Sequence, residues 1–312
     1  MPLSTDRKPI LVTGIHRSGT TWVGKILALD REVTYISEPL NVLHRPGVMR
    51  IPIENWYTYI CDDNEKCYLD AITETLEYKY HLGREILSLR SGKDALRLVR
   101  DGSRFLSGRV FRRRPLVKDP FAVFSSGWFA SRLGCQVVIT IRHPAGFVSS
   151  LKRLGWDFDF RSLLNQPLLV RDWLGGFETG LAALTDSSND LLLQGCMLWC
   201  IVYQVVSDLK RHNPDFILVR HEDLSIDPIA RYRELYAALG LTFSLRVEKK
   251  IWEYSRDSNP DELSPGRVHS IALDSQANLN NWKRRLTADE ISRVKQLTAR
   301  VYPYFYDEQD WQ

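Results

Sequence analysis

The stretch Lys8-Pro-Ile-Leu-Val-Thr-Gly-Ile-His-Arg-Ser-Gly-Thr-Thr21 decides the fold of this 312-residue chain. Its apolar first half ends at Gly14 and predicts a buried parallel strand. Apolar residues then recur at helical spacing over 20–30, so a helix is expected after the loop. In a strand–loop–helix context, two glycines spaced like Gly14 and Gly19 let backbone N–H groups and the helix N-terminus form a phosphate cradle. A tight turn with a capping threonine is the plainer interpretation.

Two differences from other phosphate-binding loops limit the class of ligand that this loop can bind. Nucleotide-hydrolysing P-loops carry a lysine directly after the second glycine, where it reaches the β and γ phosphates. Thr20 occupies that position here, and the cation lies inside the loop as Arg17. A dinucleotide site is also disfavoured, because its motif needs glycine where the chain has His16. We therefore expect the loop to hold a different phosphate donor.

A second strand–helix junction carries an arginine and a serine at a defined interval. Residues 135–141 are rich in β-branched side chains and predict the strongest strand of the chain. Arg142 follows, and Pro144 opens a helix that carries Ser150 eight residues after the arginine. The arginine can hold a phosphate through its fork, and the serine two turns along can face the same crevice. A surface arginine beside a helix cap is the alternative.

The rest of the chain alternates short apolar runs with longer periodic segments. Further strands are expected near 33–37, 115–120 and 216–219. Further helices are expected over 191–211, 227–239 and 287–302. This alternation implies an α/β fold with a central, mainly parallel sheet flanked by helices. Without repeats or low-complexity linkers, we expect one domain over 1–312, with a helical insertion around 45–112.

The composition excludes several classes of protein. Apolar residues make up 44% of the chain, which is ample for a packed core, and the net charge of +4 is too small to argue for nucleic acid. No run reaches the roughly 18 apolar residues of a membrane span, and 196–206 reads as a buried helix. The N-terminus does not resemble a signal peptide. Five cysteines without Cys-x-x-Cys spacing predict neither zinc nor a disulfide framework, so a cytoplasmic location is expected.

The two junctions together resemble the sulfotransferases that use 3′-phosphoadenosine 5′-phosphosulfate (PAPS), which have a P-loop-type, three-layer fold. In that family the loop backbone and Ser/Thr hydroxyls hold the 5′-phosphosulfate, the loop cation lies near the bridging oxygen, and a tryptophan can stack on adenine. The resemblance gives these roles to Arg17, Ser18, Gly19, Thr20, Thr21 and Trp22. It also makes Arg142 and Ser150 the ligands of the 3′-phosphate. Core packing of the first helix is the alternative for Trp22.

The base of the reaction is expected at the second strand. Sulfuryl transfer to an alcohol needs in-line placement, charge relief at the leaving phosphate and a base for the acceptor proton. Tyr35-Ile-Ser-Glu-Pro-Leu40 places Glu38 beside the sheet end that carries the loop. The segment resembles the Glu-Pro-Leu of carbohydrate sulfotransferases, which implies that Glu38 is the base. The alternatives are a histidine base (His16, His44 or His143) and a structural ion pair of Glu38 with an arginine.

Five more candidates rest on the resemblance. Related sulfotransferases place a cation near the transferring sulfuryl group, which would make Lys118 catalytic beside Arg17, with Asp119 orienting it. The Glu-Asp-Leu ending of 218–224 resembles a late strand of the family and would bring His221 near adenine. Residues 278–285 resemble the closing segment, although they lack the glycine of cytosolic members. The late donor contacts expected there are Trp282, Lys283 and Arg284.

The acceptor is less well defined by the sequence. A basic run could draw an anionic acceptor or lipid headgroup toward the site, or be an ordinary solvated face. It consists of Arg104, Arg109, Arg112, Arg113 and Arg114. Aromatic residues could stack on sugars or simply pack in the core; they are Trp56, Tyr57, Tyr59, Trp156, Phe158, Phe160 and Trp173. We therefore expect metal-independent transfer from PAPS to a carbohydrate or glycolipid hydroxyl. A P-loop kinase and a non-catalytic nucleotide-binding protein are the alternatives.

Overall fold

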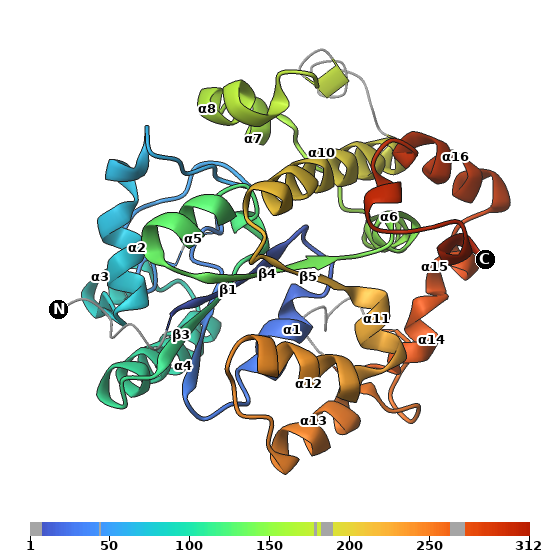
Figure 1. Cartoon of the computed structure of the whole chain (residues 1–312). Helices are drawn as coiled ribbons and strands as arrows, with labels where there is room; N and C mark the ends of the chain where they lie inside the picture. Colours follow the sequence, from blue (N-terminus) through green and yellow to red (C-terminus); the bar gives the residue numbers. More distant parts are fainter. Residues whose placement is uncertain (1–7, 44, 178–179, 182–189, 263–271) are drawn as a thin grey trace.

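A parallel five-stranded sheet forms the centre of the protein. The computed structural model describes residues 8–43, 45–177, 180–181, 190–262 and 272–312 (Figure 1). The strands are β1 (Ile10–Gly14), β2 (Val33–Ser37), β3 (Arg114–Lys118), β4 (Gln136–Ile141) and β5 (Ile217–Arg220), in the order β2-β3-β1-β4-β5. Every pairing is parallel, with Leu11 opposite both Val117 and Val137. The expected parallel α/β sheet is therefore confirmed, and each expected strand is present within two residues.

Helices cover both faces of the sheet. Those before β4 are α1 (Thr20–Leu27), α2 (Leu69–Leu76), α3 (Leu82–Ser88), α4 (Gly92–Val110) and α5 (Ser126–Leu133). Those between β4 and β5 are α6 (Pro144–Leu154), α7 (Arg161–Leu164), α8 (Pro167–Leu169), a π-helical turn (Val170–Leu174) and α10 (Leu191–His212). The last are α11 (His221–Ile226), α12 (Pro228–Ala238), α13 (Leu245–Ser255), α14 (Ser275–Leu279), α15 (Asn281–Arg285) and α16 (Ala288–Thr298).

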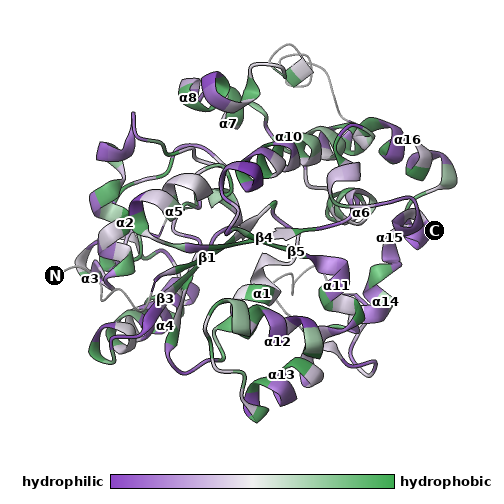
Figure 2. Ribbon diagram, viewed as in Figure 1, coloured by the Kyte–Doolittle hydropathy of each residue, from purple (hydrophilic) through white to green (hydrophobic). Residues whose placement is uncertain are grey.

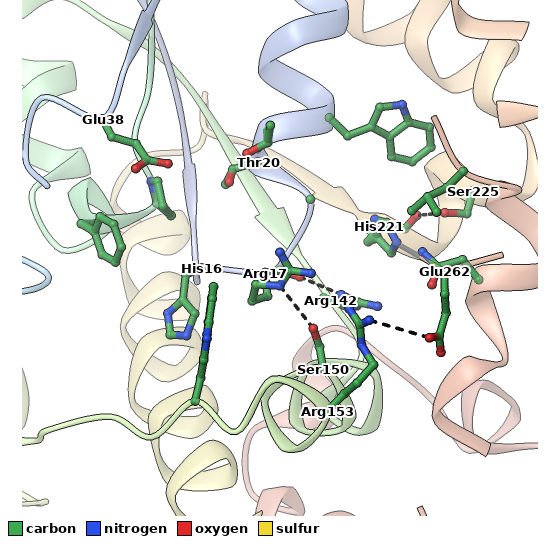
Figure 3. Close-up of a pocket in the computed structure, with 18 of the residues that line it drawn as sticks. His16, Arg17, Thr20, Glu38, Arg142, Ser150, Arg153, His221, Ser225 and Glu262 are labelled. Carbon is green, nitrogen blue, oxygen red and sulfur yellow. Dashed lines mark hydrogen bonds and ion pairs between the residues drawn. The ribbon is translucent and has the colours of Figure 1, made fainter. Parts of the chain in front are cut away.

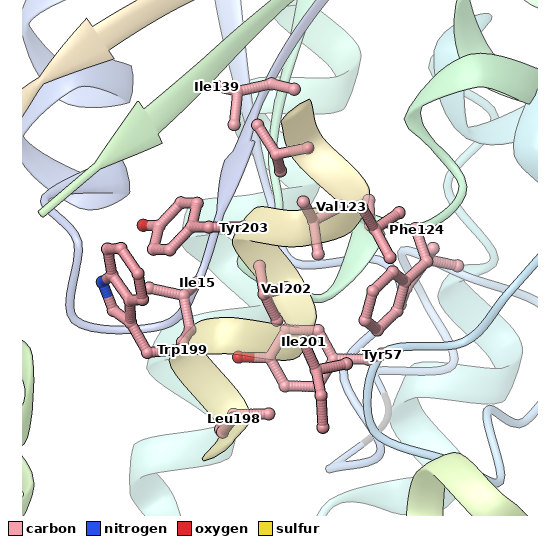
Figure 4. Close-up of a cluster of buried hydrophobic side chains, with 14 of the residues drawn as sticks. Ile15, Tyr57, Val123, Phe124, Ile139, Leu198, Trp199, Ile201, Val202 and Tyr203 are labelled. Atoms are coloured by element: carbon pink, nitrogen blue, oxygen red, sulfur yellow. The ribbon is translucent and has the colours of Figure 1, made fainter. Parts of the chain in front are cut away.

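The alternation of strand side chains builds two cores, one on each face of the sheet. Leu11 and Ile139 point into the larger core, where α10 packs against the sheet through Trp199, Val202 and Tyr203 (Figure 4). Ile10, Val12 and Val138 point to the other face and pack with α1 and α12. Figure 2 shows the central strands as hydrophobic and α15 as hydrophilic. Successive side chains of a strand point to opposite faces, so each face of the sheet carries apolar residues. Helices cover both faces, and the sheet with its two helical layers makes three layers in all.

Helix α10 is the longest helix of the described chain. It is long and apolar enough to cross a membrane, but 67% of its apolar window is buried inside the protein. It packs against α6 and α16, as expected of a core helix. Between β2 and β3 in the sequence the chain forms α2, α3 and α4, preceded by a 3₁₀ turn (Glu65–Cys67), whereas 45–64 contains no helix (Figure 1).

Candidate functional site

The carboxyl ends of all five strands meet at one edge of the sheet, and a functional candidate follows each strand. The loop 15–19 follows β1, Glu38 follows β2, Asp119 follows β3, Arg142 follows β4 and His221 follows β5. Open parallel sheets bind ligands at this edge. A cavity of about 610 Å³ opens there, bordered by the loop, Glu38, Arg142 and His221 (Figure 3).

Two glycines are required by the geometry of the loop. Gly14 has φ +143°, and a Cβ there would lie 2.4 Å from the Thr140 carbonyl oxygen. Gly19 has φ +97°, and its Cβ would lie 2.9 Å from His221 Nδ1. Both the backbone angle and the close approach exclude a side chain at these positions. The two glycines of the motif therefore set the shape of the loop, as the spacing predicts.

The helix start after the loop borders the cavity. Val23 makes a backbone hydrogen bond to the Gly19 carbonyl at 3.0 Å, so the N–H groups at the start of α1 have no acceptor within the helix. The residues of this stretch that line the cavity are Arg17, Gly19, Thr20, Thr21 and Trp22. Such a helix start favours a negative charge. It is thus a suitable position for a phosphate group.

Ser18 departs from the role that the resemblance implied. The residue is fully buried, and its hydroxyl donates to the Ile15 carbonyl at 2.5 Å and pairs with the Thr140 hydroxyl at 2.6 Å. Its own N–H also bonds to Ile15. Ser18 does not line the cavity. Its hydroxyl points toward Thr140 of β4 and holds the loop against that strand.

Four arginines converge on the cavity. Arg17 and Arg142 come from the strand ends, Arg153 from α6 and Arg285 from α15. Burial, followed by the positive charges of the other three arginines, lowers the pKa of Arg17 to about 10. Such like charges repel one another unless an anion lies between them. The cavity has no lysine among its described lining residues, so it differs from a nucleotide-hydrolysing P-loop site.

Arg142 has the environment of an anion ligand. Its side chain is buried, and Nη1 donates to the Arg17 carbonyl oxygen at 2.9 Å. Within the described part of the chain no carboxylate pairs with its guanidinium. Ser150, also buried, lies next to this group and accepts a hydrogen bond from Arg17 Nε at 3.2 Å (Figure 3). Burial lowers the pKa of Arg142 although the nearby Glu222 charge raises it, so a bound anion in direct contact would stabilise this buried cation further.

The closing segment contributes a different residue from those expected. Arg285 lines the cavity, where Nε donates to Glu262 at 2.7 Å, and Arg153 lies 3.7 Å from the same carboxylate. Lys283 instead donates to the Gln312 carbonyl, and Arg284 is exposed beside Asp261. Trp282 is also turned away and stacks on His143 at 5.3 Å. The expected contacts at 282–284 are therefore replaced by one at Arg285, because successive residues of a helix point about 100° apart.

His221 and Trp22 form a wall of the cavity. Burial, followed by the charges of Arg142 and Arg17, lowers the pKa of His221 to about 3, so the ring is neutral at physiological pH. Its Nδ1 and the Trp22 Nε1 are buried polar atoms without a hydrogen-bond partner in the described structure. The Trp22 ring meets His221 and Tyr232 edge to face. Unsatisfied polar atoms in a cavity wall are positions that a polar ligand would satisfy.

Glu38 lies at the opposite side of the cavity in a strained backbone. Its φ of +48° is in the left-handed region, which is unusual for a residue other than glycine. Its carboxylate accepts hydrogen bonds from Lys118 Nζ and from Asn41 Nδ2, the latter at 2.7 Å. Burial alone would lower the pKa of Lys118, but Tyr35 and Glu38 raise it, so the ammonium stays charged. The ion pair anticipated for Glu38 thus exists, with a lysine rather than an arginine.

Asp119 positions the Glu38 segment instead of Lys118. One oxygen accepts from the Leu40 N–H at 2.6 Å and the other from the Phe121 N–H at 2.9 Å. Burial, followed by the charge of Glu38, raises the pKa of Asp119 to about 7. The side chain is fully buried, so it fixes the turn after Glu38 to the end of β3.

The histidines proposed as alternative bases lie in different surroundings. His16 lines the cavity, and burial lowers its pKa to about 4. Its Nδ1 is 2.6 Å from the Tyr57 hydroxyl. His143 packs between aromatic rings behind the cavity, where burial lowers its pKa to about 3. His44 lies outside the described residues. Both described rings are therefore neutral at physiological pH, and of these two histidines His16 is the one that lines the cavity.

The cavity also contains residues that the sequence did not single out. Arg153 lies one turn after Ser150 on α6, a spacing that places both on one face and could have revealed it. The polar residues contributed by α11 to α14 are Ser225, Tyr254, Ser275 and Asn278. Of the aromatic residues considered, those that border the cavity are Trp56, Trp156 and Phe158. Arg114 is buried in β3 and donates to the Leu239 carbonyl, so it is not part of a solvated basic run.

Comparison with known proteins identifies the family. The model of the sulfotransferase family matches residues 9–244. Carbohydrate sulfotransferase 1 of Danio rerio is 30% identical to this chain over 195 residues. The matched region covers 60% of this chain and 39% of that protein, so the chain spans well under half the length of this relative. A sulfotransferase domain from the curacin biosynthetic pathway is similar in structure, with a TM-score of 0.48, 15% identity and coverage of 94% and 99% of the two chains. A mouse sulfotransferase complexed with PAP (adenosine 3′,5′-bisphosphate) has a TM-score of 0.43, 10% identity and coverage of 97% and 86%. Because the family model matches more than half of the chain, this protein belongs to the sulfotransferase family.

Proposed function

We propose that this protein transfers a sulfuryl group from PAPS to a hydroxyl of a carbohydrate or glycolipid, with Glu38 as the base. The observation that carries the proposal is the buried Arg142 guanidinium, which has no carboxylate partner in the described structure and lies beside Ser150 and the phosphate-type loop. The relative from Danio rerio is named a carbohydrate sulfotransferase, which supports a sugar acceptor.

The described cavity fits a donor with two separated anionic groups. The start of α1 suits the 5′-phosphosulfate, and Arg142 with Ser150 suits the 3′-phosphate. Arg153 and Arg285 lie beside Glu262, and the positive charges of Arg142, Arg153 and Arg285 act on Arg17, so a polyanionic donor would relieve the repulsion among the four arginines. His221 Nδ1 and Trp22 Nε1 could then hydrogen-bond to the nucleoside.

The chemistry divides between the two sides of the cavity. Bound PAPS supplies an activated sulfuryl group, whose bond to the 5′-phosphate oxygen breaks as the acceptor oxygen bonds to sulfur. Arg17 offsets the negative charge that develops on the leaving phosphate. The Glu38 carboxylate takes the acceptor proton, and Asp119 holds the turn that carries it through the Leu40 N–H. Lys118 pairs with the Glu38 carboxylate and can offset charge on the sulfuryl oxygens.

The test is sulfuryl transfer from ³⁵S-labelled PAPS to a panel of neutral and acidic oligosaccharides and glycolipids. We expect label in at least one acceptor class, with release of PAP and no requirement for Mg²⁺. Binding of PAP without transfer to any acceptor would support the non-catalytic alternative. Hydrolysis of ATP that depends on Mg²⁺, without transfer from PAPS, would contradict the proposal and support a kinase-like activity.

A further inference from the structure

A buried tyrosine contacts the phosphate-type loop from behind the cavity. Tyr57 is fully buried, and its hydroxyl accepts a hydrogen bond from the His16 N–H at 3.2 Å and lies 2.6 Å from His16 Nδ1. His16 lines the donor cavity, whereas Tyr57 does not. The Nδ1 side of the imidazole therefore faces the core, and the rest of the ring, with Nε2, borders the cavity.

The backbone that carries Tyr57 is strained and held in place by buried polar side chains. Tyr57 has a φ of +57°, which is in the left-handed region. The buried Ser125 Oγ donates to the Thr58 carbonyl at 2.7 Å and accepts from the Ile60 N–H at 2.9 Å. Gln166 Nε2 donates to the Tyr57 carbonyl at 3.3 Å. Strained backbone persists only where the surroundings fix it, and such positions concentrate at functional sites.

The hydrogen bonds of Tyr57 decide which nitrogen of His16 carries the hydrogen. A tyrosine hydroxyl donates one hydrogen bond, and burial raises the pKa of Tyr57, so the hydroxyl keeps its hydrogen at physiological pH. Within the described part of the chain, its only partners are the N–H and Nδ1 of His16. The N–H can only donate, so Nδ1 is the acceptor for the hydroxyl hydrogen. A hydrogen on Nδ1 would instead leave the buried hydroxyl without an acceptor, which costs a hydrogen bond.

The imidazole of His16 is then a hydrogen-bond donor toward the cavity. Burial, followed by the charge of Arg17, lowers the pKa of His16 to about 4, so the ring is neutral at pH 7 and carries one hydrogen. Because Nδ1 accepts from Tyr57, that hydrogen lies on Nε2. None of the residues that the structure describes accepts a hydrogen bond from Nε2. This N–H is therefore available to a ligand in the cavity.

The surroundings of His16 suit the acceptor of the sulfuryl group. Figure 3 shows His16 and Glu38 on one side of the cavity and Glu262 on the other. The Phe121 ring is stacked against the imidazole, with 6.4 Å between the ring centroids, and Trp56 lies 4.4 Å from Phe121. Both aromatic residues border the cavity. Aromatic walls with a few fixed polar groups are typical of sites that orient a small molecule.

We infer that Tyr57 holds His16 in the tautomer with the hydrogen on Nε2, and that Nε2 donates to the acceptor oxygen next to the reacting hydroxyl. The second half of this inference rests on the proposed sulfuryl transfer. His16 takes no proton, because neither of its nitrogens has a free lone pair, and the acceptor proton passes to Glu38. Tyr57 is thus a positioning residue. His16 selects an acceptor with two neighbouring oxygens, as on a sugar ring, over an isolated alcohol.

Nitrogen-15 NMR of the histidine side chains tests the tautomer directly and needs no sulfuryl transfer. At pH 7 we expect His16 Nδ1 to resonate as an unprotonated nitrogen and Nε2 as an N–H nitrogen, with signals that are absent from His16→Phe. Tyr57→Phe should shift the Nδ1 resonance. Tyr236→Phe removes another buried hydroxyl, which donates to the Ile26 carbonyl at 2.6 Å, and should leave the resonance in place. A hydrogen on Nδ1 in the wild type would overturn the inference, whatever the folding of the variants.

Transfer from ³⁵S-labelled PAPS to two simple acceptors tests the contact of His16 with the acceptor. The probes are trans-cyclohexane-1,2-diol and cyclohexanol, which differ only by the neighbouring oxygen. In the wild type we expect kcat/KM per hydroxyl to be about fivefold higher for the diol, the effect of one uncharged hydrogen bond. His16→Phe, which keeps a flat ring but has no donor, should lose this preference. His212→Phe, at the exposed end of α10, should retain it.

The transfer assay has outcomes that overturn the inference and one that contradicts the proposed function instead. Equal kcat/KM per hydroxyl for the two probes in the wild type would overturn the inference, and so would an unchanged preference in His16→Phe. Transfer to oligosaccharides but to neither probe would overturn it as well. Loss of all transfer in His16→Phe with normal binding of PAP would also overturn it, because His16 would then act as the base. Transfer to no acceptor by a wild type with the expected tautomer would contradict the proposed function and leave the tautomer assignment intact.

Discussion

Replacing Glu38 with glutamine removes the proposed base while keeping the shape of the side chain. The Glu38 carboxylate is held by Lys118 Nζ and by Asn41 Nδ2, so a glutamine at this position can still accept from Lys118. It cannot take the acceptor proton. Because a positioned base contributes about 10²- to 10⁴-fold to rate, we expect kcat to fall by about that factor. The affinity for PAP should stay within about threefold, since the arginines lie across the cavity.

The same substitution also acts on stability. Lys118 is 2% exposed and would lose its only carboxylate partner in the described structure, whereas Glu38 is 22% exposed and partly solvated. Removing one partner of a fully buried pair costs about 3–5 kcal/mol, and partial exposure reduces this, so we expect a loss of roughly 1–3 kcal/mol. Lys118→Met in the Glu38→Gln background removes the unpaired charge and should restore part of this stability without restoring kcat.

Three measurements on the same samples separate these effects: kcat with labelled PAPS, the Kd for PAP by calorimetry, and thermal unfolding. A low kcat of Glu38→Gln with an unchanged Kd for PAP, measured well below the Tm of the variant, would support a chemical role for Glu38; the double variant, which also lacks Lys118, serves only as the control for stability. A kcat of Glu38→Gln within about threefold of the wild type would refute the assignment of the base. The search would then return to the histidines, with His16 the described candidate in the cavity.

Three further predictions follow from the site. Arg285→Ala should weaken PAP binding by about tenfold, because the Arg285 guanidinium lines the cavity. Arg284→Ala should change PAP binding by less than about twofold, because Arg284 lies outside the cavity beside Asp261. Equal effects of the two variants in calorimetry would contradict the placement of Arg285 in the donor site. Gly19→Ala should cost about 1–3 kcal/mol, because its Cβ would lie 2.9 Å from His221 Nδ1 at φ +97°; an unchanged Tm would contradict this. Burial and then the Glu38 charge raise the pKa of Asp119 to about 7, so the native state holds a proton that the unfolded chain releases near pH ~4. Stability from this group therefore falls as the pH rises from about 4 to 7. Asp119→Asn should remove that part of the pH dependence of Tm, and parallel Tm curves for wild type and variant between pH 5 and 8 would contradict it.

The parts of the site that are local in sequence could be predicted. The strand–loop–helix around Gly14 and Gly19 is a single continuous segment, so its periodicity and spacing determine its shape. The same holds for Arg142 and Ser150, which lie on one strand–helix junction. Glu38 could be placed because a parallel sheet brings its carboxyl strand ends to one edge. Gly19, Glu38, Arg142 and Ser150 border the same cavity in the structure.

Other parts depend on tertiary contacts that the sequence does not encode locally. Ser18 turns toward the Thr140 hydroxyl, a partner 122 residues away. Arg285 faces the cavity because of the phase of the short helix α15, which three consecutive basic residues cannot define. Arg97, Arg100 and Arg104 are three and four residues apart on α4, so they share one face of this helix, which contiguous charge over 104–114 does not indicate.

The central claim is that the donor carries a phosphate at each end, with Arg142 and Ser150 at the 3′ position. The most direct test compares the calorimetric Kd of adenosine 3′,5′-bisphosphate with that of AMP, for the wild type and for Arg142→Met. The account predicts about 10- to 100-fold tighter binding of the bisphosphate to the wild type, from charge-assisted hydrogen bonds of about 1.5–3 kcal/mol, and loss of that preference in the variant. Equal affinities of the wild type for the two ligands would contradict it.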